Sequence, residues 1–327
     1  MVNETILAVI IAFVVSAVLC PIVIPFLHRL KFGQQVRDDG PQTHLKKQGT
    51  PTMGGLVILS SIIITSLLYI RDYPKIIPVL FMTVGFGVVG FLDDYIKIVM
   101  KRSEGLNPIQ KLIGQFVITG IFAYYIVTSP DIGTGMLIPF TGKYLQLPVW
   151  LFVPALFFII LGTDNGVNFT DGLDGLCSCV TFVSMLGYLL AASMLSFYHV
   201  AVLAAATAAA AAGFLVWNFY PAKVFMGDTG SLSIGGIIAV FALCIRKELL
   251  LPLLCGIFLV ESLSVMLQVS YFKYTKRKYG EGRRILLMSP LHHHYQKQGF
   301  FETKIVTRFW IVSLLLAAIT LVTLKIR

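Results

Sequence analysis

The chain has 327 residues, of which 57% are hydrophobic and only 13% are charged, and its formal net charge is +10. A soluble domain of this length needs a more polar surface, so the composition excludes an ordinary soluble protein and predicts an all-α polytopic membrane protein. The apolar runs are continuous rather than alternating, which excludes a transmembrane β-barrel.

Ten apolar segments predict about ten transmembrane helices in a single integral-membrane domain, residues 1–327. The expected spans are residues 5–27, 53–70, 76–95, 110–128, 148–163, 175–194, 199–217, 231–245, 249–270 and 305–324. The fifth and eighth are short for a hydrocarbon core of about 30 Å. The first span lacks the basic segment of a signal peptide and further spans follow it, so we expect it to be retained as a helix.

The basic residues predict the orientation in the bilayer. If the N-terminus is external, the loops on the other side and the adjoining span ends hold 19 of the 26 Lys and Arg residues. The positive-inside rule makes those loops cytoplasmic and both termini external. The basic excess is explained by topology in this way, so no nucleic-acid partner is expected. The cytoplasmic loops are residues 28–52, 96–109, 164–174, 218–230 and 271–304.

One external loop has the pattern of a β-hairpin. In the segment GMLIPFTGKYLQL, between the fourth and fifth spans, Thr141 and Gly142 supply a turn between β-prone arms. Pro139 must lie where the strand pairing requires no N–H group. We therefore expect a short external β-hairpin here.

Five aspartates lie at the expected cytoplasmic ends of the spans. An ionised side chain in hydrocarbon costs at least about 3 kcal/mol, so acids near that depth need cations, water or a function. Any one of them could be a helix cap. Five in clusters that contain Gly or Lys indicate a functional site instead. They are Asp93 and Asp94 at the end of the third span, Asp171 and Asp174 at the start of the sixth, and Asp228 before the eighth.

The residues around these acids predict a magnesium–pyrophosphate site. Asn168, Asp171 and Asp174 recur every third residue, so a helical turn would place them on one face. The helix start that follows Gly227 would offer free N–H groups to an anion. Mg²⁺ prefers oxygen ligands, typically one or two carboxylates with substrate phosphates. The expected balancing cations are Lys46, Lys47 and Lys111.

Two features of the C-terminal third add to this picture. Consecutive histidines at positions 292–294 diverge in direction, so we do not expect them to chelate one ion together, but at least one is expected to donate to a phosphate. Glu261 lies in the middle of the ninth apolar run. It either bonds Ser262 or Ser264 or faces a polar groove, and the sequence leaves both open.

Five motifs together resemble the phospho-N-acetylmuramoyl-pentapeptide transferase (MraY) family, within the polyprenyl-phosphate N-acetylhexosamine-1-phosphate transferase superfamily. They are GQQVRDDGPQTHLKKQGTPTMGG, FLDDY, NFTDGLDGL, NFYPAKVFMGDTGSL and MSPLHHHYQKQGF, and they occur in this order over essentially the whole chain. Sister transferases that use UDP-GlcNAc share the DD and GD elements. They lack the first block and the SPLHHH context.

The resemblance implies an enzyme that transfers phospho-MurNAc-pentapeptide from UDP-MurNAc-pentapeptide to undecaprenyl phosphate, giving lipid I and UMP, with Mg²⁺ as cofactor. It also implies a cytoplasmic active site in the bacterial plasma membrane, a ninth helix that is broken near the bilayer, and a homodimer. A sister transferase that uses UDP-GlcNAc is the alternative. A transporter is disfavoured, because transporter sites usually lie near the midplane between repeats.

Residue roles are implied motif by motif. Asp228 matches the magnesium ligand, while Asp93 and Asp94 match a pair that activates the lipid phosphate. The positions that match the nucleotide and phosphate pocket are Lys47, Thr52, Lys111, Asn168, Asp171, Asp174, Asn218, Gln268, His292, His293 and His294, of which His293 is also expected to be catalytic. Whether Lys46 or Lys47 contacts the substrate is open.

The two adjacent aspartates are expected to act differently. Lys97 lies three residues after Asp94, and an ion pair between them would lower the basicity of that carboxylate. We therefore expect Asp93 to act on the lipid phosphate and Asp94 to position it, although Lys97 could reach either acid. Direct attack of the lipid phosphate and a two-step route through an aspartyl-phosphate both remain open.

Overall fold

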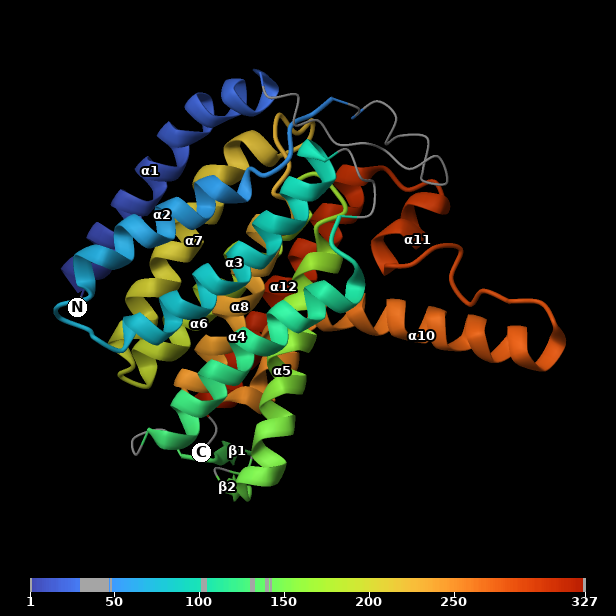
Figure 1. Cartoon of the computed structure of the whole chain (residues 1–327). Helices are drawn as coiled ribbons and strands as arrows, with labels where there is room; N and C mark the ends of the chain where they lie inside the picture. Colours follow the sequence, from blue (N-terminus) through green and yellow to red (C-terminus); the bar gives the residue numbers. More distant parts are fainter. Residues whose placement is uncertain are drawn as a thin grey trace.

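The computed structural model describes residues 2–29, 47, 49–100, 105–129, 133–138, 141 and 143–325. Three residues that carried expectations, Lys46, Pro139 and Gly142, lie outside these ranges. The described chain is a helical bundle from which one long helix projects, with a small two-stranded sheet at one end (Figure 1). This confirms the all-α polytopic membrane class.

Each of the ten expected spans contains a helix in the described part of the chain. Eight of these helices are long and apolar enough to cross a membrane, and a bent pair adds a ninth candidate. The remaining one, α2, is apolar but has only 15 residues. The helices are α1 (Val2–Arg29), α2 (Gly55–Tyr69), α3 (Ile76–Val99), α4 (Pro108–Thr128), α5 (Val149–Thr170), α6 (Leu176–Met194), α7 (Tyr198–Asn218), α8 (Gly227–Cys244), α10 (Gly256–Tyr279) and α12 (Glu302–Lys325).

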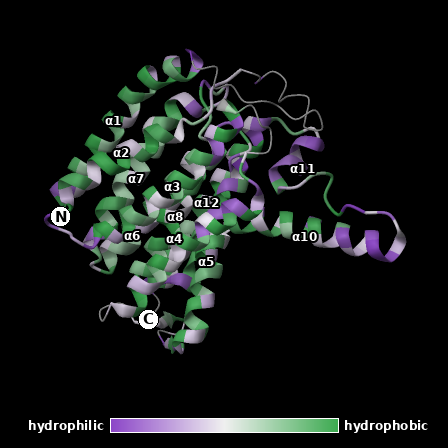
Figure 2. Ribbon diagram, in the orientation of Figure 1, coloured by the Kyte–Doolittle hydropathy of each residue, from purple (hydrophilic) through white to green (hydrophobic). Residues whose placement is uncertain are grey.

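The centre of the bundle is formed by α7 and α8. Of the 18-residue apolar segment in each helix, 78% is buried in α7 and 83% in α8, against 22% in α1. Helix α7 is rich in alanine, and small residues let neighbouring helix backbones approach closely in a membrane. The Ser16 hydroxyl of α1 accordingly donates to the Ala210 carbonyl of α7 over 2.8 Å. The outer helices expose apolar side chains that suit contact with lipid, and hydrophobic residues dominate the bundle (Figure 2).

The ninth apolar segment is broken, as the resemblance implies. A 3₁₀ turn η2 (Glu248–Leu250) and a short helix α9 (Leu251–Leu254) meet α10 at an angle of 86°. Helix α10 then leaves the bundle, and its far end is hydrophilic (Figures 1 and 2). A short helix α11 (Leu291–Lys297) follows it and packs against α10 and α12.

The expected hairpin is present. Strands β1 (Gly135–Leu137) and β2 (Tyr144–Gln146) pair antiparallel, with Met136 opposite Leu145. Lys247, which precedes η2, donates to the Tyr144 hydroxyl over 3.3 Å. The hairpin lies at the opposite end of the bundle from α11 (Figure 1).

Several expected helix bounds are wrong; α10, for example, runs to Tyr279 rather than ending near residue 270. Helix α5 runs to Thr170 rather than ending near residue 163, and α8 begins at Gly227 rather than at residue 231. The polar run after residue 163 looks like a loop by hydropathy, but its side chains bond to neighbouring helices. Asp164, for example, is fully buried and accepts a 2.6 Å hydrogen bond from Gln115 of α4. Because protein partners replace water, the helix continues through these residues.

Candidate active site

Three aspartates from two helices meet at one end of the bundle. Asp93 and Asp94 lie in α3, and Asp228 lies in the first turn of α8; their carboxylate oxygens come within 4.8 Å of one another. The close approach depends on Gly90, one turn before Asp93, because a Cβ atom there would lie 2.1 Å from the Asp228 carbonyl oxygen. We call these three residues the aspartate cluster. Its convergent carboxylate oxygens are the donor set that a hard cation such as Mg²⁺ prefers.

Two lysines and an asparagine hold Asp228. Lys97 and Lys111 each place their Nζ atom 3.0 Å from one Asp228 oxygen, and Lys97 also pairs with Asp93. The Asn168 amide donates to the other Asp228 oxygen over 2.8 Å and accepts from Lys111 over 3.2 Å. With all five charged groups ionised, three carboxylates face two lysines. The cluster therefore keeps net negative charge, which suits a cation.

The start of helix α4 places Lys111 beside Asp228. The Gln110 side chain accepts the Asn107 N–H group over 3.1 Å, and Pro108 occupies the first turn, where its missing N–H group costs nothing. This start places Lys111 in the first turn of α4, beside Asp228.

The start of α8 is capped by carboxylates of the chain itself. Asp94 accepts hydrogen bonds from the N–H groups of Asp228 at 3.1 Å and Thr229 at 2.9 Å, and from the Thr229 hydroxyl at 2.7 Å. Asp171 accepts from the Gly227 N–H group at 3.1 Å. The expectation that these N–H groups are free for an external anion is wrong. Asp228 does not cap its own helix either, since its carboxylate binds the two lysines and Asn168.

The expected ion pair between Asp94 and Lys97 is also wrong. Lys97 pairs with Asp93, four residues before it on α3, while both oxygens of Asp94 are directed to the start of α8. Asp93 additionally accepts the Leu106 N–H group over 2.9 Å. The expected reason for choosing Asp93 as the base, that it is free of a cation, is therefore wrong. Asp94 still has the contacts of a positioning residue, because both of its oxygens are occupied by the start of α8.

Asn168, Asp171 and Asp174 do not share one helical face, because α5 ends at Thr170 and α6 begins after Gly175. Each has a separate partner: Asn168 binds Asp228, Asp171 binds the start of α8, and Asp174 accepts the Ala222 N–H group over 2.9 Å. Burial raises the pKa of Asp171 well above its usual range, and the charge of Asp228 raises it further. The turn of residues 171–175 therefore joins several parts of the site.

Lys47 contacts that turn through Asp174. Its Nζ atom is 2.5 Å from oxygens of both Asp174 and Glu302, and Glu302 also accepts the Asp174 N–H group over 2.7 Å. The structure thus brings Lys47 and Asp174 together in an ion pair. Glu302, at the start of α12, was not anticipated.

Three other expected pocket residues have different surroundings. Thr52 lies beside the cluster, since its hydroxyl oxygen and an Asp94 oxygen are both 2.8 Å from where a Cβ atom on Gly227 would be. Asn218 is 2% exposed; its amide accepts from the Ser178 hydroxyl and donates to a backbone carbonyl. Gln268 binds the backbone of residues 285 and 286. The side chains of Asn218 and Gln268 thus bond to other groups of the fold.

The three histidines have separate hydrogen-bond partners, but the rings of His292 and His293 do not diverge as expected, since their centroids are 4.1 Å apart. His292 is fully buried and its Nδ1 atom lies 3.1 Å from Glu261. His293 is partly exposed and its Nδ1 atom lies 2.8 Å from the side-chain oxygen Oε1 of Gln296, while His294 Nδ1 accepts the Leu287 N–H group over 3.1 Å. The structure thus answers the open question about Glu261: its carboxylate faces a histidine rather than a serine.

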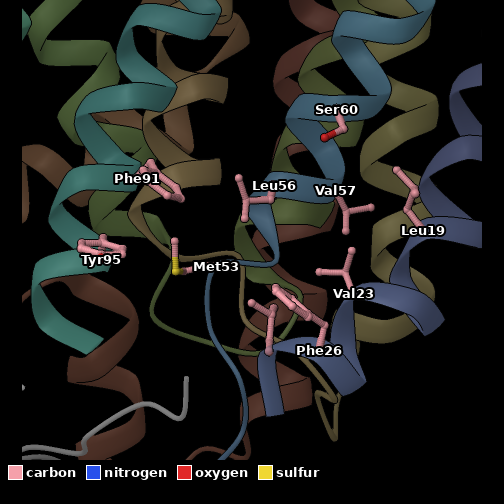
Figure 3. A pocket seen from close by; sticks show the side chains of 10 residues that line it. Leu19, Val23, Phe26, Met53, Leu56, Val57, Ser60, Phe91 and Tyr95 are labelled. Atoms are coloured by element: carbon pink, nitrogen blue, oxygen red, sulfur yellow. The ribbon is translucent and has the colours of Figure 1, made fainter. Parts of the chain in front are cut away.

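Two apolar pockets flank this end of the bundle. One, of about 370 Å³, lies between α1, α2 and α3; Leu19, Val57, Phe91 and Tyr95 line it (Figure 3). The other is a groove of about 660 Å³ between α4, α5 and α10. Asn165 lines the groove one turn before Asn168, so the groove reaches to within one helical turn of a residue that binds Asp228.

Sequence reasoning missed Asp164 and Glu302, and it paired Lys97 with Asp94 rather than with Asp93 and Asp228. Lys97 carried a usable signal, since it follows Asp93 at the i,i+4 spacing of a helical ion pair. Glu302 and Asp164 depend on contacts with residues more than 40 positions away in sequence, for which the local pattern has no signal.

A polytopic helical bundle whose buried aspartates, lysines and asparagine gather at one end, beside apolar grooves, belongs to the membrane-embedded transferases. Residues 76–246 match the family Glycosyl transferase family 4, and residues 47–59 match the phospho-N-acetylmuramoyl-pentapeptide-transferase signature 1. The chain belongs to the phospho-N-acetylmuramoyl-pentapeptide-transferase family, which confirms the resemblance.

Relatives of that name match this chain over nearly its whole length. The one from Caldicellulosiruptor bescii is 47% identical over 326 residues, covering 99% of each chain. Those from Bacillus pumilus and Bacillus subtilis are 48% and 46% identical over 315 residues, covering 95% of each chain. This similarity supports a transferase rather than a transporter.

Proposed function

We propose that this protein transfers phospho-MurNAc-pentapeptide from UDP-MurNAc-pentapeptide to undecaprenyl phosphate, giving lipid I and UMP in the membrane step of peptidoglycan synthesis. Family membership supports the choice of substrates. The observation that carries the proposal is the aspartate cluster with Lys97 and Lys111, at a bundle end that an apolar groove approaches. Such a site can receive a diphosphate from water and a phosphate from a lipid.

The cluster fits Mg²⁺. Asp228 is the proposed ligand, and the neighbouring carboxylate oxygens and net negative charge are what a hard cation requires. When bound there, Mg²⁺ supplies charge neutralisation for the diphosphate and for the UMP leaving group.

The protein's own groups would position the reactants. Asp93 would orient or deprotonate the lipid phosphate, one oxygen of which forms a bond to the β-phosphorus of the donor while the bond to the UMP oxygen breaks. Asp94 would hold the start of α8, and with it Asp228, in place. Lys97 and Lys111 would neutralise charge as the phosphoryl group passes between the two oxygens. Phosphoryl transfer depends mainly on such positioning and charge neutralisation.

The site would face the cytoplasm, with both termini external, because the loops on that side are rich in Lys and Arg. A cytoplasmic face is also where a nucleotide-linked donor would be available. The remaining polar positions of the expected pocket would line the nucleotide side, and a second copy of the chain would form the homodimer that the family resemblance implies.

The groove between α4, α5 and α10 is the proposed place for the prenyl chain. Filling this groove should weaken binding of the lipid acceptor and leave binding of the UDP-linked donor unchanged. Gly162 lines this groove, and a Cβ atom there would meet nothing within 4 Å, so Gly162→Phe should fold while occupying the space. Displacing two buried CH₂ groups costs about 1.6 kcal/mol, so the KM for undecaprenyl phosphate should rise about tenfold. Initial rates at varied lipid and saturating donor measure this.

A matched variant tests which pocket is used. Ser60→Phe fills the pocket between α1, α2 and α3 instead, and it should leave the KM for the lipid unchanged. The donor KM should stay constant in both variants. An increase in the lipid KM with Ser60→Phe and none with Gly162→Phe would place the prenyl chain in the other pocket.

The sister reaction is separated by a substrate-swap assay. Purified protein is incubated with undecaprenyl phosphate and either UDP-MurNAc-pentapeptide or UDP-GlcNAc, and released UMP is measured. We expect turnover with the first donor only. Turnover with UDP-GlcNAc alone would overturn the proposed donor.

A further inference from the structure

Polar side chains on one face of α10 hold the segment that follows this helix. Glu261, Gln268 and Thr275 are spaced seven residues apart, two helical turns each, and they are 0%, 8% and 1% exposed. Because α10 projects from the bundle, these three side chains would face lipid or water if the following segment did not cover them. Each instead bonds to a group in residues 283–292. Thr275 accepts the Arg283 N–H group at 2.8 Å, Gln268 accepts the Ile285 and Leu286 N–H groups at 3.1 and 2.9 Å, and Glu261 pairs with His292.

The innermost of these contacts is a buried carboxylate–imidazole pair. Glu261 Oε2 and His292 Nδ1 are 3.1 Å apart, and both side chains are fully buried. A buried carboxylate requires a donor, so the pair places the His292 proton on Nδ1 whenever Glu261 is ionised. His292 Nε2 then has no hydrogen-bond partner among the described residues.

That free edge of His292 rests on Gly172. A Cβ atom at position 172 would lie 2.2 Å from His292 Nε2, so the imidazole fits only because this residue is glycine. Gly172 directly follows Asp171, which accepts the Gly227 N–H group beside Asp228. A continuous set of contacts therefore runs from α10 through His292 and the 171–175 turn to the aspartate cluster.

We infer that Glu261 is a positioning residue: it orients His292 against Gly172 and so fixes α11 relative to the 171–175 turn. This inference rests on the proposed function. His292 has no exposed surface with which to touch a substrate, whereas its neighbour His293 on the same helix is partly exposed. The Glu261–His292 pair acts through the alignment of α11 and the turn, and a misplacement of about 1 Å can cost on the order of 100-fold in rate.

The test is kinetic and uses the full-length protein. Glu261→Leu removes the acceptor for His292 at similar volume, while Glu261→Gln keeps an acceptor oxygen. We expect Glu261→Leu to lower kcat by on the order of 100-fold with a small change in donor KM, and Glu261→Gln to restore most of the loss. Ser264→Ala is the matched control, because among the described residues that hydroxyl bonds only the Glu261 backbone carbonyl of its own helix, and the kcat of this variant should be unchanged.

A kcat near the wild-type value in Glu261→Leu, or equal losses in the Leu and Gln variants, would overturn the inference. A second pair keeps it testable if Glu261→Leu does not fold. His292→Asn retains a donor near the place of Nδ1, so it should keep several-fold more activity than His292→Leu. Equal inactivity of these two variants would mean that Nε2 acts directly. Inactive wild-type protein would count against the proposed function, whereas active wild type with an active Glu261→Leu variant would count against this inference alone.

Discussion

Asp228→Asn should reduce turnover by roughly 10²–10³-fold and leave the fold intact, because the charge at the centre of the aspartate cluster disappears while the side-chain volume stays the same. The carboxylate binds Lys97, Lys111 and Asn168 at once. An amide can keep one or two of these hydrogen bonds, but it is a weak ligand for a hard cation. Initial rates of UMP release over a range of Mg²⁺ concentrations measure the loss, and excess Mg²⁺ should recover part of it.

Asp72→Asn is the control for Asp228→Asn. It makes the same chemical change at an exposed position in the loop between α2 and α3 and should not alter the rate. Near-normal activity of Asp228→Asn at ordinary Mg²⁺ concentrations would exclude Asp228 as the metal ligand.

Asp93→Asn and Asp94→Asn should both be nearly inactive but should differ in stability. Asp94 accepts three hydrogen bonds at the start of α8, and leaving such buried donors without an acceptor costs about 1–3 kcal/mol. Asp94→Asn should therefore lower the unfolding temperature in detergent. Asp93→Asn loses an ion pair with Lys97, which is partly exposed, and should unfold close to the wild-type temperature.

Their pH–rate profiles separate the chemical role from the positioning role. With saturating donor, Asp93→Asn should lose the fall in rate at acidic pH, because the group whose protonation causes that fall has been removed. Asp94→Asn should retain this acidic limb at a lower rate. The opposite result, with the limb lost only in Asp94→Asn, would reverse the two roles.

The sequence was sufficient for the helical membrane class, the hairpin and the aspartates, because these depend on local composition. Apolar runs of about 20 residues predict spans whatever their partners are. The same locality explains the errors at the ends of α5 and α8. Hydropathy places Asp164 in a loop, although Gln115 donates to one of its oxygens inside the bundle. Predicting a helix end from a run of polar residues is therefore unreliable where those residues bond to other parts of the protein.

The hydrogen-bond and ion-pair partners of the site residues were harder to predict than the site residues themselves. Asp94 and Lys97 are close in sequence, but the start of α8, more than 130 residues away, competes for Asp94. The Glu261–His292 pair has a sequence separation of 31 and depends on the path of the chain after α10. Only the folded structure assigns such contacts, because any of several cations or donors could reach each acid.

The central claim is tested most directly by measuring UMP and lipid product together. Purified protein is supplied with UDP-MurNAc-pentapeptide and Mg²⁺, with and without undecaprenyl phosphate. We expect sustained release of UMP in equal amount to a lipid-linked phospho-MurNAc-pentapeptide, dependent on the lipid and abolished by chelating the metal. Absence of UMP release with both substrates present, or continued release of UMP without a lipid product, would contradict the proposed transfer.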